Sequence, residues 1–321
     1  LGASHPLEIV FTGGGTESDN LGVAGPVLAA GPGAGIVTTA VEHEAVLETA
    51  RFLERLGCPV GIVGVDGTGR VDPAAVTEAV GTTTAVVSVM AANNETGVRQ
   101  PVAEVAAALA GRPVLVHSDA VQAFVAEEVT VGTLGADLVT LAAHKFGGPK
   151  GVGLLRVPRH TPLEPVLHGG GQELGFRSGT HNVAGIVGMA AAMQAAAGDR
   201  ERFRREVAEE RRTFEEALSA RIEGLVVTGS GAERLVQHSH LRIPGVAADT
   251  LLIRLDGAGL AASAGSACHS GAVTASHVLA AMGVAPEDAA SSVRFTFGWT
   301  TCPGDGNDAA RIVLEALEGL R

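Results

Sequence analysis

Short apolar segments alternate with segments of helical periodicity through the first half of this chain, and this alternation limits the folds open to it. Apolar runs predict strands at 7–12, 35–40, 60–65, 84–92, 113–119, 138–143 and 152–157. Apolar residues at helical spacing predict helices at 17–30, 44–56, 72–80 and 101–110. Strands that are apolar throughout are typical of parallel sheets with both faces buried. The pattern therefore predicts an α/β fold with a parallel sheet covered by helices.

A lysine, Lys145, directly follows the predicted strand 138–143 and precedes a loop rich in glycine and proline. We expect this strand end to bury the lysine, which would lower its pKa and make it an amine nucleophile. Lysines of this kind form Schiff bases with carbonyl cofactors. The alternative is an ordinary exposed loop lysine, and Lys145 taken alone favours that alternative.

A second predicted strand, 113–119, ends in the carboxylate of Asp119, and Gln122 follows shortly after it. In open α/β sheets the carboxyl ends of strands face the crevice where ligands bind. Pyridoxal phosphate requires a lysine for its aldehyde and a carboxylate that keeps its pyridine nitrogen protonated. Asp119 and Lys145 together therefore favour a pyridoxal-phosphate site.

A glycine turn, 13–16, joins the first predicted strand to the first predicted helix. Backbone N–H groups at a helix N-terminus form an anion site, so Gly15 and Thr16 are candidate phosphate ligands. The dinucleotide and P-loop motifs are not present in this turn. His43, after the strand 35–40, can stack on a cofactor ring and move protons, or it can simply begin the following helix.

Nine sequence blocks, in this order over nearly the whole chain, resemble the cysteine desulfurases of the NifS/IscS kind. These proteins fall within the class V aminotransferase family of fold-type I pyridoxal-phosphate enzymes. The blocks are Phe11-Thr-Gly-Gly-Gly-Thr-Glu-Ser-Asp-Asn, Val41-Glu-His-Glu-Ala-Val-Leu, Ala92-Asn-Asn-Glu-Thr-Gly-Val, His117-Ser-Asp-Ala-Val-Gln, His144-Lys-Phe-Gly-Gly-Pro-Lys-Gly, His168-Gly-Gly-Gly-Gln-Glu, Arg177-Ser-Gly-Thr, Ser263-Ala-Gly-Ser-Ala-Cys and Ser292-Val-Arg-Phe.

The resemblance implies a large domain with a mostly parallel, seven-stranded sheet and a smaller α+β domain. We expect the large domain at 1–198, a connecting helix at 199–223 and the small domain at 224–321. Helical spacing at 182–197 and at 199–222 predicts two separate helices there. Family members also carry an opening segment before the first strand, which we expect to be missing from this chain.

The resemblance also implies the residues that hold the cofactor. Lys145 would bear it and move the α-proton of the substrate, Asp119 would contact the ring nitrogen, and Gln122 the ring hydroxyl. His43 would stack on the ring. The phosphate ligands would be Gly15, Thr16, His144 and, from the partner subunit of a homodimer, Thr180. One departure stands out: Ala142 occupies a position where close relatives have a phosphate-binding serine, so we expect looser but retained binding.

The substrate implied by the resemblance is L-cysteine, with Asn94 and Arg294 holding its carboxylate. Simple turn chemistry is the alternative for Asn94, and a structural salt bridge is the alternative for Arg294. Cys268 lies in a run of small residues, which favours an exposed, reactive thiol. It would receive the sulfur as a persulfide, releasing L-alanine, and pass it to an acceptor protein that the sequence does not name.

Composition excludes several other classes of protein. The 23 basic and 35 acidic residues give a net charge of −12, which argues against direct nucleic-acid binding over a broad surface. No apolar run has the length of a membrane span. The three cysteines form neither a disulfide framework nor a zinc spacing, so we expect no metal and a cytoplasmic location.

Three other functions stay open. A selenocysteine lyase would prefer selenocysteine to cysteine, and an ordinary class V aminotransferase would not need Cys268. A catalytically impaired scaffold that binds a sulfur-acceptor partner is the third. The pathway of the sulfur, whether toward iron–sulfur clusters, thiolated tRNA or cofactors, or sulfur-modified DNA, is left undetermined by the sequence.

Overall fold

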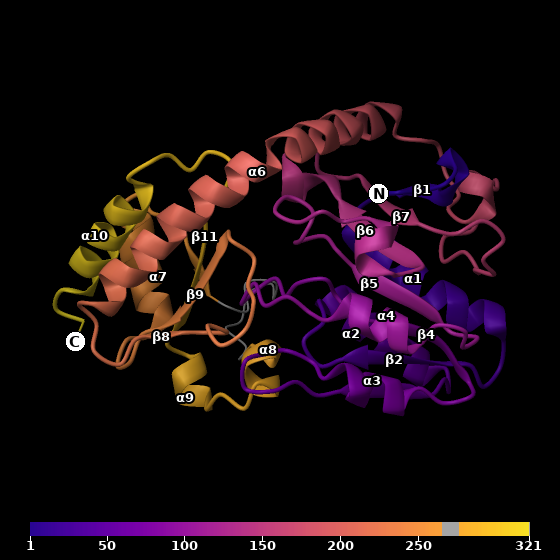
Figure 1. Ribbon diagram of the computed structural model, residues 1–321, viewed down its shortest axis with the longest axis horizontal. Helices are drawn as coiled ribbons and strands as arrows, with labels where there is room; N and C mark the ends of the chain where they lie inside the picture. Colours follow the sequence, from indigo (N-terminus) through magenta and orange to yellow (C-terminus); the bar gives the residue numbers. More distant parts are fainter. Residues whose placement is uncertain (265–275, 321) are drawn as a thin grey trace. The chain divides into compact units, whose positions relative to one another are not determined.

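A computed structural model describes residues 1–264 and 276–320, and within them the chain forms two compact units. The first unit contains residues 1–64, 71–93 and 100–199. The second contains the short segments 65–70 and 94–99 together with the chain from residue 200 onward. Each unit has its own sheet (Figure 1). Among the described residues, no helix combines the length and the apolar character needed to cross a membrane.

The sheet of the first unit has seven strands in the order β1-β7-β6-β5-β4-β2-β3. β2 to β6 pair in parallel, whereas β7 is antiparallel to both of its neighbours, β1 and β6. The strands are β1 (Ile9–Thr12), β2 (Gly35–Thr39), β3 (Val60–Val63), β4 (Thr84–Ser88), β5 (Leu115–Asp119), β6 (Leu138–Ala142) and β7 (Gly153–Arg156). The expected mostly parallel α/β sheet is confirmed.

The helices of this unit follow the strands as the apolar spacing predicts, with short additions. They are α1 (Gly15–Ala30), α2 (Glu44–Arg55), α3 (Pro73–Ala79), α4 (Val102–Ala108) and α5 (Val131–Leu134), with 3-10 turns η1 (Pro6–Glu8), η2 (Ala143–Phe146) and η3 (Glu173–Gly175). α1 runs along the sheet against β4 to β7 (Figure 1). Val23 and Val27 of α1 share one apolar core cluster with Ile36 of β2 and with Val46 and Leu53 of α2. This packing fixes the first turn of α1 beside the strand ends.

One long helix, α6 (Val183–Ser219), replaces the two helices that we expected on either side of residue 198. The expected break is wrong. Gly198 is exposed and lies within the helix, where a glycine costs only about 1 kcal/mol relative to alanine. Strong helix formers flank it, and Arg212 on the following turns pairs with both Glu209 and Glu216.

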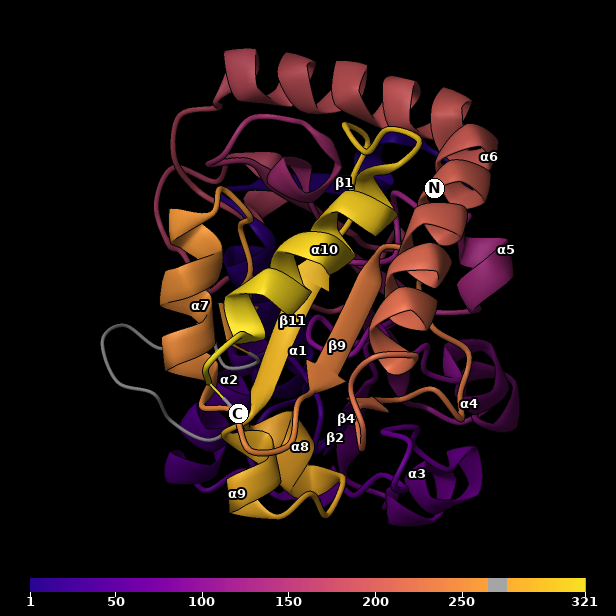
Figure 2. The same cartoon turned by 90° about the vertical axis from the view of Figure 1, so that its left-hand side faces the viewer.

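The sheet of the second unit is antiparallel throughout, in the order β10-β11-β9-β8. Its elements are β8 (Val226–Val227), β9 (His238–Arg242), α7 (Ala248–Gly257), β10 (Ser263–Ala264), α8 (His277–Ala281), α9 (Pro286–Ala289), β11 (Ser292–Thr296) and α10 (Asp305–Leu317). α10 and α7 pack against each other and lie over β11 (Figure 2). The ring of Phe214 in α6 lies 4.9 Å from Phe295 and 5.6 Å from Phe297, so the end of α6 belongs to this core.

Candidate active site

Three of the predicted site residues lie at the carboxyl ends of parallel strands in the first unit. Asp119 is the last residue of β5 and pairs with Thr140 of the neighbouring β6. Lys145 lies in η2, directly after β6, and His43 follows β2 as the N-cap of α2. Burial raises the pKa of Asp119, and the neighbouring His43, the Val121 N–H group and the positive charge of Lys145 oppose that rise. The structure therefore brings the three side chains into one electrostatic site.

Lys145 is exposed, so the expectation that it is buried is wrong. The reason is local: β6 ends at Ala142, and the tight turn of η2 directs the lysine out of the core. Phe146 takes the buried position instead, with its ring 4.8 Å from that of Phe124. Burial thus does not activate Lys145 in this structure, and its link to the site is its proximity to Asp119.

His43 combines the two functions that the sequence presents as alternatives. Its Nδ1 atom accepts a hydrogen bond from the backbone N–H of Ala45 at 3.1 Å, which caps the first turn of α2. The ring is half-buried and lies close enough to Asp119 to influence the pKa of that carboxyl group. With Nδ1 as the acceptor, the neutral ring carries its proton on Nε2. The cap therefore sets both the orientation and the tautomer of the ring.

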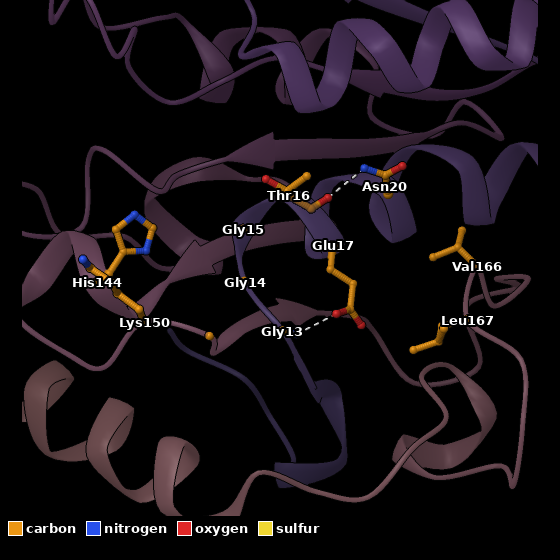
Figure 3. Close-up of a pocket in the computed structure, with 11 residues that line it drawn as sticks. Gly13, Gly14, Gly15, Thr16, Glu17, Asn20, His144, Lys150, Val166 and Leu167 are labelled. Atoms are coloured by element: carbon orange, nitrogen blue, oxygen red, sulfur yellow. Dashed lines mark hydrogen bonds between the residues drawn. The ribbon is translucent and has the colours of Figure 1, made fainter. Parts of the chain in front are cut away.

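The glycine turn 13–16 forms one wall of a cavity of about 720 Å³ (Figure 3). The Gly13 N–H group donates to Glu17 at 2.7 Å, which closes the turn before α1. A Cβ atom at Gly15 would lie 3.1 Å from Val121 and 3.3 Å from the methyl group of Ala142. Glycine thus lets the backbone lie close against the strand ends. The first N–H groups of α1 have no partner within the helix, so this cradle suits an anion.

His144 and Lys150 line the same cavity and give it basic side chains (Figure 3). Burial lowers the pKa of His144, and the charges of Lys145 and Lys150 lower it further. His144 is therefore a neutral donor or acceptor near pH 7. Sequence reasoning did not select Lys150, although it lies in the quoted block that contains Lys145. Its signal was the basic residue five positions after Lys145, at the end of the glycine-rich turn.

The loop that carries Thr180 is tied to this region through another residue of its motif. The Arg177 Nε atom donates to Glu17 at 2.7 Å, and Gln172 accepts the Gly179 N–H group at 2.8 Å. Thr180 itself is exposed. The structure thus shows how the loop is held, and the expected contact of Thr180 with a partner subunit stays a prediction.

The remaining predicted residues lie elsewhere. In the second unit, the guanidinium Nη1 of Arg294 in β11 donates to the backbone carbonyl of Asn94 at 2.9 Å, although the two are 200 residues apart in the chain. Gln122 is half-buried in the turn after β5. Cys268 lies outside the described residues. Its expected exposure and reactivity stay predictions.

Sequence reasoning missed a buried polar group behind the strand ends. Asp19 of α1 is 2% exposed, and His117 of β5 is fully buried. The signal for His117 was a polar residue within the apolar strand β5, whereas Asp19 lies among the polar residues 16–20 and carries no sequence signal of its burial. Asp19 lies close enough to Asp119 for the two carboxyl groups to interact electrostatically.

The fold and these strand-end residues define a fold-type I architecture, and comparison with known proteins gives the same result. The model of the family "aminotransferase class-V" matches residues 1–305, and the chain belongs to this family. The cysteine desulfurase IscS of Dictyoglomus turgidum is 39% identical over 98% of this chain and 80% of the relative. The predicted resemblance to the IscS/NifS group is confirmed.

Two solved structures support the same grouping. A NifS-like protein aligns with a TM-score of 0.90 and 33% identity over 98% of this chain and 83% of its own. SspA, solved in complex with cysteine, aligns with a TM-score of 0.78 and 30% identity over 91% of this chain and 82% of its own.

Proposed function

We propose that this protein is a pyridoxal-phosphate-dependent cysteine desulfurase, which removes sulfur from L-cysteine, releases L-alanine and leaves a persulfide on Cys268. The observation that carries the proposal is the set of Lys145, Asp119 and His43 at the carboxyl ends of parallel strands. The family relationship supports it, because relatives at 39% identity bear the name cysteine desulfurase. The structure of SspA with cysteine supports the choice of substrate.

The residues of the first unit fit the cofactor. The α1 N-terminus at Gly15 and Thr16 is a cradle for its phosphate, with His144 on the same cavity wall. The positive charge of Lys145 near Asp119 favours the anionic form of this carboxyl group, which would suit a protonated ring nitrogen. When bound, pyridoxal phosphate supplies an electron sink for charge at the substrate α-carbon. The proposal assigns the ring hydroxyl to Gln122 and the ring face to His43.

Side chains of the protein would then transfer the proton, bind the substrate and accept the sulfur. Lys145, exposed on its turn, would hold the cofactor aldehyde and move the α-proton of the substrate. Arg294, with Asn94 beside it, would bind the substrate carboxylate. The Cys268 thiolate attacks the substrate sulfur: an S–S bond forms, the substrate C–S bond breaks, and the β-carbon takes a proton. Cysteine and one thiol give alanine and one persulfide, so the step balances without a further reagent.

The test is to supply purified protein with pyridoxal phosphate and L-cysteine and to measure alanine and, with a thiol reductant, sulfide. We expect equal amounts of both. Cys268→Ala should keep the cofactor absorbance band and lose the sulfide. Cys302→Ala is the matched control, because Cys302 is an exposed cysteine with no assigned role, and it should react like the unmodified protein.

Other outcomes identify the other functions. Full turnover in Cys268→Ala indicates an aminotransferase, and a strong preference for selenocysteine indicates a selenocysteine lyase. Protein that binds no cofactor and forms no alanine indicates a scaffold. Each of these results contradicts the desulfurase assignment.

The proposal extends to partners and location. The exposed Thr180 suits a homodimer in which it contacts the phosphate bound by the partner subunit. A persulfide requires an acceptor, so we expect a sulfur-acceptor protein, for example in iron–sulfur cluster assembly. A free persulfide-forming cysteine works in a reducing compartment, which favours the cytoplasm.

A further inference from the structure

A line of buried polar groups crosses three neighbouring strands beneath α1 in the first unit. The Oγ atom of Ser88 in β4 lies 2.8 Å from His117 Nδ1, and His117 Nε2 lies 3.0 Å from the hydroxyl of Thr140 in β6. Asp19 of α1 completes the line, hydrogen-bonded to the Thr140 side chain. All four side chains are at most 2% exposed. These residues connect the core of the unit to Asp119, which pairs with Thr140 across β5 and β6.

The carboxyl group of Asp19 has too few donors for a buried anion. Its Oδ1 atom has no hydrogen-bond partner among the described residues. The nearest titratable nitrogen, His117 Nε2, is 3.7 Å away and is already within hydrogen-bond distance of Thr140. An ionised carboxylate removed from water needs a paired charge or several hydrogen bonds. One hydroxyl partner suits an uncharged carboxylic acid instead.

His117 does not supply the missing positive charge. It is fully buried, with a hydroxyl group at each ring nitrogen. The α1 backbone lies so close that a Cβ atom at Gly22 would be 2.7 Å from the ring, which leaves no space for water. Burial lowers the pKa of His117 to about 3, so the ring is neutral at physiological pH.

Asp119 has the backbone hydrogen-bond donor and the nearby positive charge that Asp19 lacks. It accepts the Val121 N–H group at 2.9 Å, and it lies near His43 and the positive charge of Lys145. Burial raises the pKa of Asp19 well above its usual value, and the charges of Asp119 and Glu42 raise it further. Glu42, another buried acid whose charge acts on Asp19, accepts from Thr39 and from the Met90 N–H group, and burial raises its pKa to about 8. Two neighbouring buried carboxyl groups do not both ionise, and the better-supported one carries the charge.

We infer that Asp19 is held as an uncharged carboxylic acid, a positioning residue that anchors the Thr140–His117–Ser88 line and leaves Asp119 as the anion at the strand ends. Its effect on the reaction, through the ring nitrogen that Asp119 would contact, rests on the proposed function. The protonation state of Asp19 does not, because every group in this argument belongs to the chain itself.

The test is infrared difference spectroscopy of cofactor-free protein at neutral pH, comparing the unmodified chain with Asp19→Asn. We expect the variant to lose a carbonyl stretch of a protonated carboxyl group and to keep its carboxylate bands. Glu42→Gln is the matched variant, since it replaces another buried acid with its amide and should remove a different carbonyl band. Loss of carboxylate absorbance in Asp19→Asn would overturn the inference.

Cofactor affinity gives a second readout. The amide in Asp19→Asn imitates the uncharged acid, so we expect a dissociation constant for pyridoxal phosphate within about twofold of the unmodified value. Asp19→Ala removes one of the two side-chain partners of Thr140, the other being His117, and should weaken binding roughly tenfold. If Asp19→Asn loses as much affinity as Asp119→Asn, Asp19 acts as an anion and the inference is wrong. Unmodified protein that binds no cofactor would instead contradict the proposed function, whatever the infrared result.

Discussion

At the scale of single residues, Ala142 is the position where this chain departs from the pattern of its relatives. Its methyl group is buried at the end of β6, 3.3 Å from the Cβ position of Gly15, so a hydroxyl there would lie beside the phosphate cradle. We predict that Ala142→Ser binds pyridoxal phosphate about tenfold more tightly, the effect of one hydrogen bond to a charged group. Titration of the cofactor absorbance band measures the affinity.

The neighbouring alanine offers a control for this change. Ala143 is equally buried but lies against Gly148, not against Gly15. Ala143→Ser therefore adds the same hydroxyl outside the cradle and should not tighten binding. Equal affinities for Ala142→Ser and the unmodified chain would show that the missing hydroxyl is unimportant.

The position of a residue could be predicted from the sequence where a local motif specified it. The prediction failed where the environment of the residue depends on segments that are distant in the chain. Asp119 and His43 were placed correctly at strand ends, because an apolar run marks where a strand stops. The exposure of Lys145 depends on a tight turn after β6 that the apolar pattern does not encode. Asp19 was missed because its environment comes from β5 and β6, more than 90 residues away in the chain.

At the scale of elements, His43 begins α2 and also faces the site, and these two roles can be separated. Asparagine is a good N-cap but has no ring, so His43→Asn should keep the stability of the cofactor-free protein and lose desulfurase turnover. His43→Ala should lose turnover and also about 1 kcal/mol of unfolding free energy, because the Ala45 N–H group loses its acceptor. Denaturant unfolding and sulfide release measure the two effects.

Asp72 provides the matched control, because it caps α3 by accepting from the Ala74 N–H group at 2.9 Å. Asp72→Ala should cost about the same stability and leave turnover unchanged. Normal turnover in His43→Asn would mean that His43 serves only as a helix cap.

Elements with a strong periodic pattern were predicted well, and those set by long-range pairing were not. The helices α1 and α2 were expected within two residues of their observed ends. The antiparallel direction of β7 follows from the short turn after β6, since a parallel pair needs a longer crossover. The continuity of α6 was missed because a single exposed glycine is a weak helix breaker.

At the scale of the whole molecule, buried titratable groups should give the cofactor-free protein maximal stability in mildly acidic solution. Burial lowers the pKa of His117 and of His240 to about 3, so below 6.5 the unfolded chain binds more protons and stability falls as the pH falls. Burial raises the pKa of Glu42 to about 8, so stability also falls as the pH rises above 4.5. Between 4.5 and 6.5 the contributions of the two histidines are opposed by those of Glu42 and of Asp19, whose pKa burial also raises.

Below that window each histidine should lower the free energy of unfolding by about 1.4 kcal/mol per pH unit, until its folded-state pKa is reached. Above the window Glu42 should lower it by a similar amount per pH unit. Guanidinium unfolding midpoints measured from pH 4 to pH 8 test this expectation. Glu42→Gln should reduce the loss of stability toward pH 8 and leave the acid side unchanged. A midpoint that rises steadily to pH 8 would show that Glu42 is ionised in the folded protein.

Cofactor binding should depend on the assembly of two chains, because we propose that Thr180 completes the site of the partner subunit. In a mixed dimer of Lys145→Ala and Thr180→Val chains, one site would then carry both changes and the other neither. We expect one site per mixed dimer with unmodified cofactor affinity, measured on dimers purified with two different tags. In the control, Thr16→Val replaces Thr180→Val. Thr16 lines the cavity of its own chain, so the one site that still has its lysine would carry the weakened cradle. If the Thr180→Val mixture shows only weakened binding, Thr180 acts within its own subunit, and a dimer would not be needed to complete the site.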